Sequence, residues 1–338
     1  MTTTAAEPRA SAREVPPVAA FVARRLVGAV IALLIASVLI FLGTSVLPGD
    51  AASVVLGRGA TPTAVARLNK QMHLDKPLLS QYSTWLTGFV HGDLGNSSVG
   101  LAQGEKSAPV WPLISSAVQN TLILALVTAF FMIPLSLGLG AVAAIYAGRP
   151  VDHIISVATL AAIALPEFVI GSLLVGVFFV WLDWLPPVAL IPPGDNPLDH
   201  PTKLVLPVAT LLFASLAAGV RMVRAGMVET LQTEYVQTAR LNGLAERWVL
   251  WRYAMRNALA PSVQVLAQNL QWLIGGIIIT ENVFAYPGIG SLLVTAVGNR
   301  DEGVVQSVAM LIAVVYVMLN LVADLVVMLL VPKLREPA

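Results

Sequence analysis

The stretch TARLNGLAERWVLWRYAMRNAL, residues 238–259, holds the densest cluster of positive charge in the sequence. It carries four arginines, although Asp, Glu, Lys and Arg together make up only 12% of the 338 residues. Apolar segments long enough to cross a bilayer flank it on both sides. The sequence therefore places concentrated charge, around one glycine, between two expected membrane spans.

The composition is that of a membrane protein. Hydrophobic residues make up 57% of the chain, above the roughly 45–50% of soluble domains, and a bilayer accommodates that excess. A net charge of +1 without a long basic stripe argues against nucleic acid as a partner. The absence of cysteine excludes disulfides, thiolate metal sites and cysteine nucleophiles. The four histidines lie too far apart to suggest a metal site.

Apolar runs predict an all-α membrane protein with six transmembrane helices. The expected spans are 26–47, about 121–146, 154–182, 204–220, 262–279 and 304–331. The first run is too long for a signal peptide and is expected to stay uncleaved. Pro134 predicts a kink in the second span, and Pro166-Glu167 interrupts the third. Most Arg and Lys residues fall in cytoplasmic segments if both termini are cytoplasmic, which is the orientation we expect.

The opening stretch predicts two helices joined by a turn. The fourth span is expected to continue as helix into the cytoplasm, and Asn242-Gly243 supplies the stop because glycine readily adopts the left-handed conformation. A second helix follows up to Pro261, with Trp251, Met255 and Leu259 expected on one face. The arginines either merely satisfy the positive-inside rule or belong to a surface presented to a cytosolic partner. Composition leaves both readings open.

Motifs in order along the chain resemble importer-type ABC permeases of the dipeptide and oligopeptide class. YVQTARLNGLAERWVLWRYAMRNALAP resembles their cytoplasmic EAA loop, although Gln237 and Thr238 replace its first letters and Tyr253 its usual histidine. Ala245 stands where a polar cap is common, and Val331-Pro332 where Asp-Pro is usual. Similar stretches are RRLVGAVIALLIASVLIFLGTSVLPGD, LDKPLLSQYSTWLTGFVHGDLGNS, ENVFAYPGIGSLLVTAVGNRD and NLVADLVVMLLVPKLR, so the resemblance covers nearly the whole chain.

The resemblance implies a type I ABC importer permease fold in a bacterial cytoplasmic (inner) membrane. It also implies several partners: a homologous second permease subunit, two cytosolic P-loop ATPase subunits and an extracytoplasmic solute-binding protein. By the same resemblance, the EAA loop would form a coupling helix that inserts into a groove of a cytosolic ATPase subunit. The residues that match the coupling turn and the helix after it are Thr238, Ala239, Arg240, Gly243, Leu244, Arg252, Arg256 and Asn257.

The expected organisation follows from the spans and the resemblance together. It comprises a disordered cytoplasmic tail (1–20), a first transmembrane helix (21–47), an extracytoplasmic segment (48–118), a permease core of five transmembrane helices (119–332) containing the coupling loop (227–261), and a cytoplasmic C-terminus (333–338).

The chain lacks the P-loop pattern GxxxxGK[ST], so we expect no cofactor in it and no enzymatic activity. ATP and Mg are expected in the partner ATPases. The function predicted is a permease subunit of an ATP-driven importer for dipeptides or oligopeptides. Alternatives are the same architecture carrying nickel or another small solute, or an ion-coupled secondary transporter, which would need an inverted repeat that the sequence does not show. An intramembrane enzyme would need a nucleophile–base set that is also missing.

Polar residues within the expected spans are candidates for the substrate path. Gln264, Gln268 and Gln271 share one helical face, which must point into protein or a water-filled route rather than into lipid. Glu167 follows Pro166 in the third span and is the second candidate. A purely structural role remains open for both. Glu281 is expected to shape the outer loop, and Asp324 to pack helices together.

Overall fold

The computed structural model describes residues 17–45, 56–57, 60–72, 75–255, 273 and 275–330. Within these ranges the secondary structure is helical, and the only β-type pairing is an isolated bridge between Asn96 and Pro109. The main helices are α1 (Pro17–Ser45), α3 (Pro62–Gln71), α4 (Leu78–Val90), α5 (Ser98–Ala102), α6 (Trp111–Ile145), α7 (Pro150–Ala164), α8 (Glu167–Val175), α9 (Pro201–Leu231), α10 (Glu234–Leu241), α11 (Glu246–Trp248), α13 (Ile289–Gly298) and α14 (Glu302–Leu330). The predicted all-α class is confirmed.

Four of these helices, α1, α6, α9 and α14, are long and apolar enough to cross a membrane. Helix α6 begins at Trp111 rather than near Thr121, and it continues through Pro134. Helix α9 continues through Pro207 to Leu231, past the predicted span 204–220, and this continuation as helix is what the sequence predicts. Of the predicted span 262–279, the structure describes Leu273 and a helix that runs over residues 275–283.

The interruption of the third predicted span at Pro166-Glu167 is a sharp bend between two helices. Helix α7 and the pair formed by α8 and the π-helix Gly176–Trp181 meet at an angle of 108°. Pro166 explains the break, because its ring disfavours a helical conformation of the preceding residue. Leu165 accordingly has an extended backbone with φ −96° and ψ 132°. The interruption expected from the sequence is thus confirmed, and Glu167 is the first residue of the helix after the bend.

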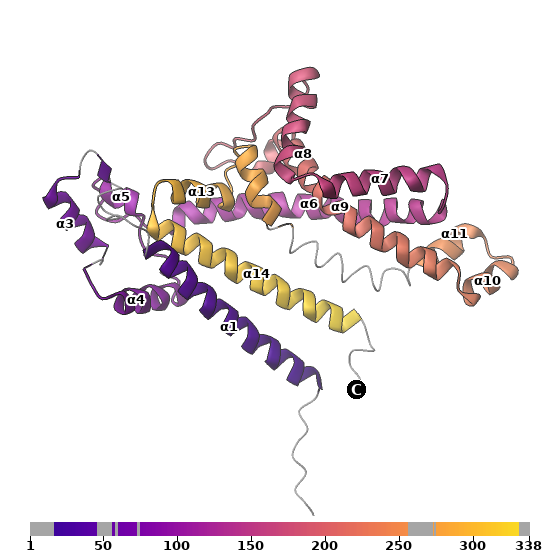
Figure 1. The fold of residues 1–338 in the computed structure, drawn as a ribbon, viewed down its shortest axis with the longest axis horizontal. Helices are drawn as coiled ribbons and strands as arrows, with labels where there is room; N and C mark the ends of the chain where they lie inside the picture. Colours follow the sequence, from indigo (N-terminus) through magenta and orange to yellow (C-terminus); the bar gives the residue numbers. More distant parts are fainter. Residues whose placement is uncertain are drawn as a thin grey trace, which may run out of the picture.

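Helices α6 and α9 form the centre of the bundle (Figure 1). They approach closely at Gly140, where an added Cβ would lie 2.6 Å from the Cβ of Val223. Around them, a buried cluster joins Leu124 of α6 and Leu211 of α9 to Phe284 and Tyr286. Glycine at this contact lets the two backbones pack, which is the usual way helices associate in membranes.

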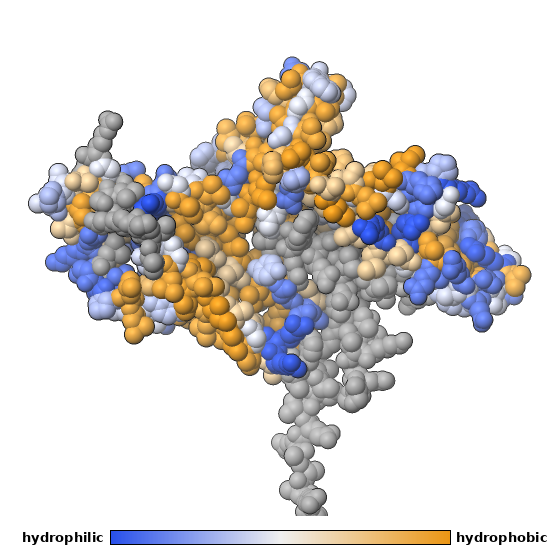
Figure 2. All heavy atoms as spheres, viewed as in Figure 1, coloured by the Kyte–Doolittle hydropathy of each residue, from blue (hydrophilic) through white to orange (hydrophobic). Residues whose placement is uncertain are grey.

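Helices α1 and α14 run side by side as a separate arm (Figure 1). Arg25 of α1 and Asp324 of α14 form an ion pair at 3.1 Å, which confirms a helix-packing role for Asp324. Large apolar side chains are exposed along α1, among them Val27, Ile35 and Leu39, and Figure 2 shows apolar residues covering this region. Exposure of this extent requires lipid or protein as the surroundings.

The connection between α1 and α6 folds against the end of α14. Asp301 accepts hydrogen bonds from the Ser98 backbone N–H at 2.8 Å and from the Ser97 hydroxyl. Ser307 donates to the Leu94 carbonyl at 2.6 Å. Helix α3 in this connection begins at Pro62, and the Thr61 side chain accepts a hydrogen bond from the Ala64 N–H. The connection is thus anchored to the membrane-spanning part of the chain.

Candidate coupling site and membrane path

Beyond α9 the chain forms a bent unit, residues 234–255, which we call the elbow. It consists of α10, a turn at Gly243, α11 and a π-helix from Val249 to Met255. Gly243 has φ +76°, in the left-handed region that favours glycine. Its N–H donates to the Arg240 carbonyl at 3.0 Å, and the Leu244 N–H donates to the Ala239 carbonyl at 3.3 Å. The predicted glycine turn is confirmed.

A small apolar cluster holds the two arms of the elbow together. Val236 and Ala239 of α10 pack against Val249 of the second arm, and all three are buried. Ala239 therefore shapes the elbow from inside and is not available for contact with another protein. Thr238 is exposed on the other side of α10, where its hydroxyl donates to the Glu234 carbonyl at 2.9 Å.

Arg240 bridges the turn instead of projecting freely. Its guanidinium donates to both carboxylate oxygens of Glu246, at 2.6 and 3.1 Å. Both side chains are about half exposed, so the pair adds little stability, on the order of 0–1 kcal/mol. Two parallel hydrogen bonds nevertheless restrict the angle between the arms. Glu246 was not predicted from the sequence to be part of the elbow's contacts. The feature that could have indicated it is its position shortly after the Gly243 turn, within reach of Arg240.

The exposed surface of the elbow is apolar and aromatic. Leu241 is 87% exposed, and other large side chains project beside it. These exposed residues are Tyr235, Leu244, Trp248 and Trp251. The Arg252 guanidinium lies 5.8 Å from the Trp248 ring centroid, within cation–π range. An exposed aromatic and apolar cluster of this kind is typical of a protein-interaction surface.

The apolar ridge predicted on the second arm is not continuous. Trp251 is 72% exposed, whereas Met255 is only 7% exposed. Met255 packs against Ala144 of α6 and against Val223 and Met227 of α9. The second arm therefore attaches the elbow to the bundle through Met255. Arg256 and Asn257, and the Leu259 expected on the same face, lie outside the described residues.

An ion pair that sequence reasoning missed connects α7 to α9 above the elbow. Arg224 donates to both oxygens of Asp152, at 2.5 and 2.7 Å, and Asp152 is 2% exposed. The Gly148 N–H also donates to Asp152 at 2.9 Å. The sequence feature that could have indicated this ion pair is Asp152 itself, an aspartate in the first turn of an otherwise apolar helix.

Glu167 lies at the bend between α7 and α8, beside the helix over 275–283. An added Cβ at Gly276 would lie 2.6 Å from Oε1 of Glu167. Its Oε2 is buried and has no hydrogen-bond partner among the described residues. A cavity of about 730 Å³ opens here, lined also by Ala214 of α9 and Tyr316 of α14. The other path candidates, Gln264, Gln268 and Gln271, lie outside the described residues.

Glu281 shapes the loop between the helix over 275–283 and α13, which is the shaping role that the sequence predicts. It is fully buried and accepts hydrogen bonds from the Thr121 hydroxyl at 2.5 Å and from the Gly290 N–H at 2.7 Å. The Tyr286 hydroxyl donates to the Asn120 carbonyl at 2.7 Å. Burial, together with the nearby Glu281 carboxylate, raises the pKa of Tyr286, so this phenol keeps its proton. The network ties the start of α13 to α6.

Comparison with known proteins defines the class. The chain matches the binding-protein-dependent transport system inner membrane component over residues 136–336, and the N-terminal part of a binding-protein-dependent transport system membrane component over residues 18–138. It belongs to this family and is the permease of a binding-protein-dependent ABC importer. It is thus a multi-pass inner-membrane protein, with the type I permease fold.

Two relatives and one solved structure are particularly informative. The glutathione transport system permease protein GsiC of Escherichia coli (strain K12) is 34% identical over 315 residues, which cover 93% of this chain and 98% of the relative. The protein of the same name in Salmonella choleraesuis (strain SC-B67) is 33% identical over the same length. An inward-facing MetNI methionine ABC transporter superposes with a TM-score of 0.53 at 16% identity, covering 65% of this chain and 96% of that one. The latter supports the fold alone.

Proposed function

We propose that the chain is the permease subunit of an importer for dipeptides or oligopeptides, driven by ATP hydrolysis in two cytosolic P-loop ATPase subunits. The observation that carries the ATPase assignment is the elbow: a glycine turn with an exposed aromatic and apolar surface beyond the end of α9. A homologous second permease completes the translocation path, and an extracytoplasmic binding protein delivers the cargo. ATP and Mg bind to the ATPases, and both termini of this chain lie in the cytoplasm.

The elbow is built to transmit motion into the bundle. Helix α9 is continuous from the membrane to Leu231, and the second arm packs through Met255 against α6 and α9. The ion pair between Asp152 and Arg224 adds α7 to the same unit. Closure of the ATPases would therefore move α6, α7 and α9 together, because close-packed interiors shift as units rather than deform continuously.

Peptide cargo is supported by the relatives named as glutathione permeases, since glutathione is a tripeptide. The Glu167 carboxylate, half-buried at the bend, offers a charged partner for a peptide ammonium group inside the membrane. Nickel or another small solute is the alternative cargo. An ion-coupled secondary transporter is a further alternative. It differs from the ATP-driven importer in its source of energy, which is an ion gradient instead of ATP hydrolysis.

Reconstitution of the complete assembly tests the proposal. The tagged chain is purified with its co-purifying subunits, placed in liposomes with the cognate binding protein, and supplied with ATP inside. We expect accumulation of radiolabelled alanyl-alanine or glutathione that requires ATP hydrolysis and is insensitive to a protonophore. A variant ATPase lacking its P-loop lysine is the control. Uptake that persists with this variant, or uptake of nickel alone, would contradict the proposal.

Replacing Glu167 by glutamine tests the path. The substitution keeps the size of the side chain and removes its charge, so uptake of dipeptides with a free amino terminus should fall about ten-fold, the expected loss for one charge-assisted hydrogen bond. Uptake of N-acetylated dipeptides should not change. Glu105→Gln alters an exposed carboxylate of the α1–α6 connection and serves as the matched control. Equal effects on both kinds of peptide would assign Glu167 a structural role.

A further inference from the structure

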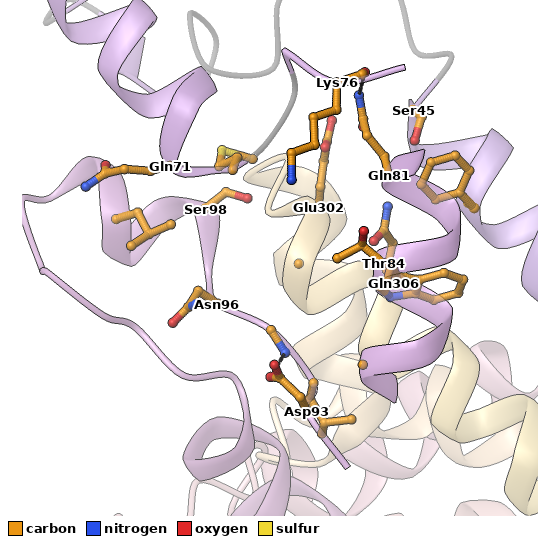
Figure 3. Close-up of a pocket in the computed structure, with 18 residues that line it drawn as sticks. Ser45, Gln71, Lys76, Gln81, Thr84, Asp93, Asn96, Ser98, Glu302 and Gln306 are labelled. Atoms are coloured by element: carbon orange, nitrogen blue, oxygen red, sulfur yellow. Dashed lines mark hydrogen bonds between the residues drawn. The ribbon is translucent and has the colours of Figure 1, made fainter. Parts of the chain in front are cut away.

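A second cavity lies between the α1–α6 connection and the adjoining ends of α1 and α14 (Figure 3). Its volume is about 320 Å³. One face of α4 forms a wall, with Gln81, Thr84, Trp85 and Gly88 at helical spacing. Lys76, just before α4, and Glu302, the first residue of α14, also line it. The cavity is separate from the one at Glu167, which is lined by other residues.

Three groups in this cavity have unused binding capacity. In the part of the chain that the structure describes, neither the Lys76 ammonium nor the Glu302 carboxylate takes part in an ion pair or a hydrogen bond. The indole N–H of Trp85 is buried and, among the same residues, has no acceptor. A buried donor without a partner costs on the order of 1–3 kcal/mol. A cation, an anion and a neutral donor therefore line one small space without satisfying each other.

The walls of the cavity are held in place independently of any ligand. Asp301, next to Glu302, accepts hydrogen bonds from Ser97 and Ser98. Gly303 brings α14 so close to the connection that an added Cβ would lie 2.0 Å from the Asn96 carbonyl oxygen. Gln306, which also lines the cavity, donates to the Thr44 hydroxyl of α1 at 2.8 Å. A site supported in this way needs little rearrangement to bind, which favours affinity.

We propose that this cavity is a binding site for a short zwitterionic peptide. Lys76 would pair with the carboxylate of the ligand, Glu302 with its ammonium group, and the Trp85 indole would donate to a ligand oxygen. The presence of both charge signs selects a zwitterion over a simple anion or cation. A volume near the lower limit of small-molecule sites, about 300 Å³, suits a dipeptide or tripeptide.

The ligand class rests on the proposed function, whereas the site itself rests on the cavity, on the Lys76 and Glu302 charges that line it and on the buried Trp85 indole N–H. With the α1–α6 connection outside the membrane, the cavity lies on the side where a binding protein releases cargo. It is therefore a site that cargo occupies before it enters the membrane path at Glu167.

Titration calorimetry on the full chain in lipid nanodiscs tests the inference without any transport partner. The probe is alanyl-alanine, compared with its N-acetylated and its C-terminally amidated derivatives. We expect the unmodified dipeptide to bind at least about ten-fold more tightly than either derivative, because each derivative lacks one charge. Trp85→Phe should weaken binding about five-fold while preserving an aromatic ring.

Two variants assign the ends of the ligand. The Lys76→Gln variant should bind the amidated peptide as tightly as alanyl-alanine but still bind the acetylated peptide more weakly. The Glu302→Gln variant should show the opposite pattern. Lys70→Gln and Glu105→Gln change exposed charges on the same connection outside the cavity and should leave binding unchanged. The thermal unfolding midpoint of each variant identifies any variant that fails to fold. The comparison of the three ligands needs only the wild-type chain, so it tests the inference even if a variant does not fold.

Two results would overturn the inference: no binding of alanyl-alanine to the wild-type chain, or equal binding of all three ligands. Either result leaves the proposed function standing if the reconstituted assembly still imports the peptide with ATP. Conversely, an assembly that imports no peptide contradicts the proposed function, even if the nanodisc titration shows charge-selective binding.

Discussion

Replacement of Gly243 by valine is expected to lower ATP-driven uptake about ten-fold or more while the protein remains inserted in the membrane. Gly243 has φ +76°, and a Cβ added there would meet no neighbouring atom within 4 Å. The penalty is therefore purely conformational, about 1–2 kcal/mol for an ordinary L-residue and larger for a β-branched one. Relief of this strain would reorient the two arms of the elbow and displace its exposed surface from the ATPase. Uptake and ATP hydrolysis are measured together on the reconstituted assembly.

The matched control for this experiment is Gly243→Asn. Asparagine tolerates the left-handed conformation, so this variant should retain at least half of the wild-type uptake. The two substitutions add side chains of similar size into the same open space, and they differ mainly in backbone preference. If both variants transported at the wild-type rate, the geometry of the turn would not matter for coupling, and the elbow would lose its assigned role.

Replacing Asp152 by asparagine should cause the largest loss of stability. Asp152 is 2% exposed and receives two hydrogen bonds from Arg224, so its removal leaves a partly buried guanidinium without its counter-ion. Removing one partner of a buried pair costs about 3–5 kcal/mol, and the one-third exposure of the Arg224 side chain places the expected cost nearer 2–3 kcal/mol. We expect a clear fall in the midpoint of thermal unfolding in detergent.

Asp199→Asn provides the comparison for this loss, because Asp199 is exposed and the same chemical change there should alter stability by no more than about 0.5 kcal/mol. A second comparison replaces both members of the pair, Asp152→Leu with Arg224→Met, and should recover part of the stability because no uncompensated charge remains. An Asp152→Asn variant as stable as Asp199→Asn would show that the pair contributes nothing to the joining of α7 and α9.

The elbow shows how far sequence reasoning reaches. The stop at Gly243 was predictable because a single residue's conformational freedom determines it. The face of the second arm was predicted from helical spacing, and here the prediction failed: Trp251 and Met255 share the spacing but differ in burial. Periodicity assigns residues to a face, whereas coverage depends on where neighbouring helices lie. Here Met255 is covered by Ala144, Val223 and Met227, whereas Trp251 is not part of that cluster.

By itself, the sequence determined the helical membrane class, the position of most spans and the turn of the elbow, because hydrophobic run length and glycine conformation are local properties. Tertiary structure decided which charges are paired. Asp152 and Arg224 lie far apart in the chain, and Lys76 and Glu302 line one cavity although more than half of the sequence separates them. Such encounters depend on how helices pack, and no local pattern in the sequence encodes them.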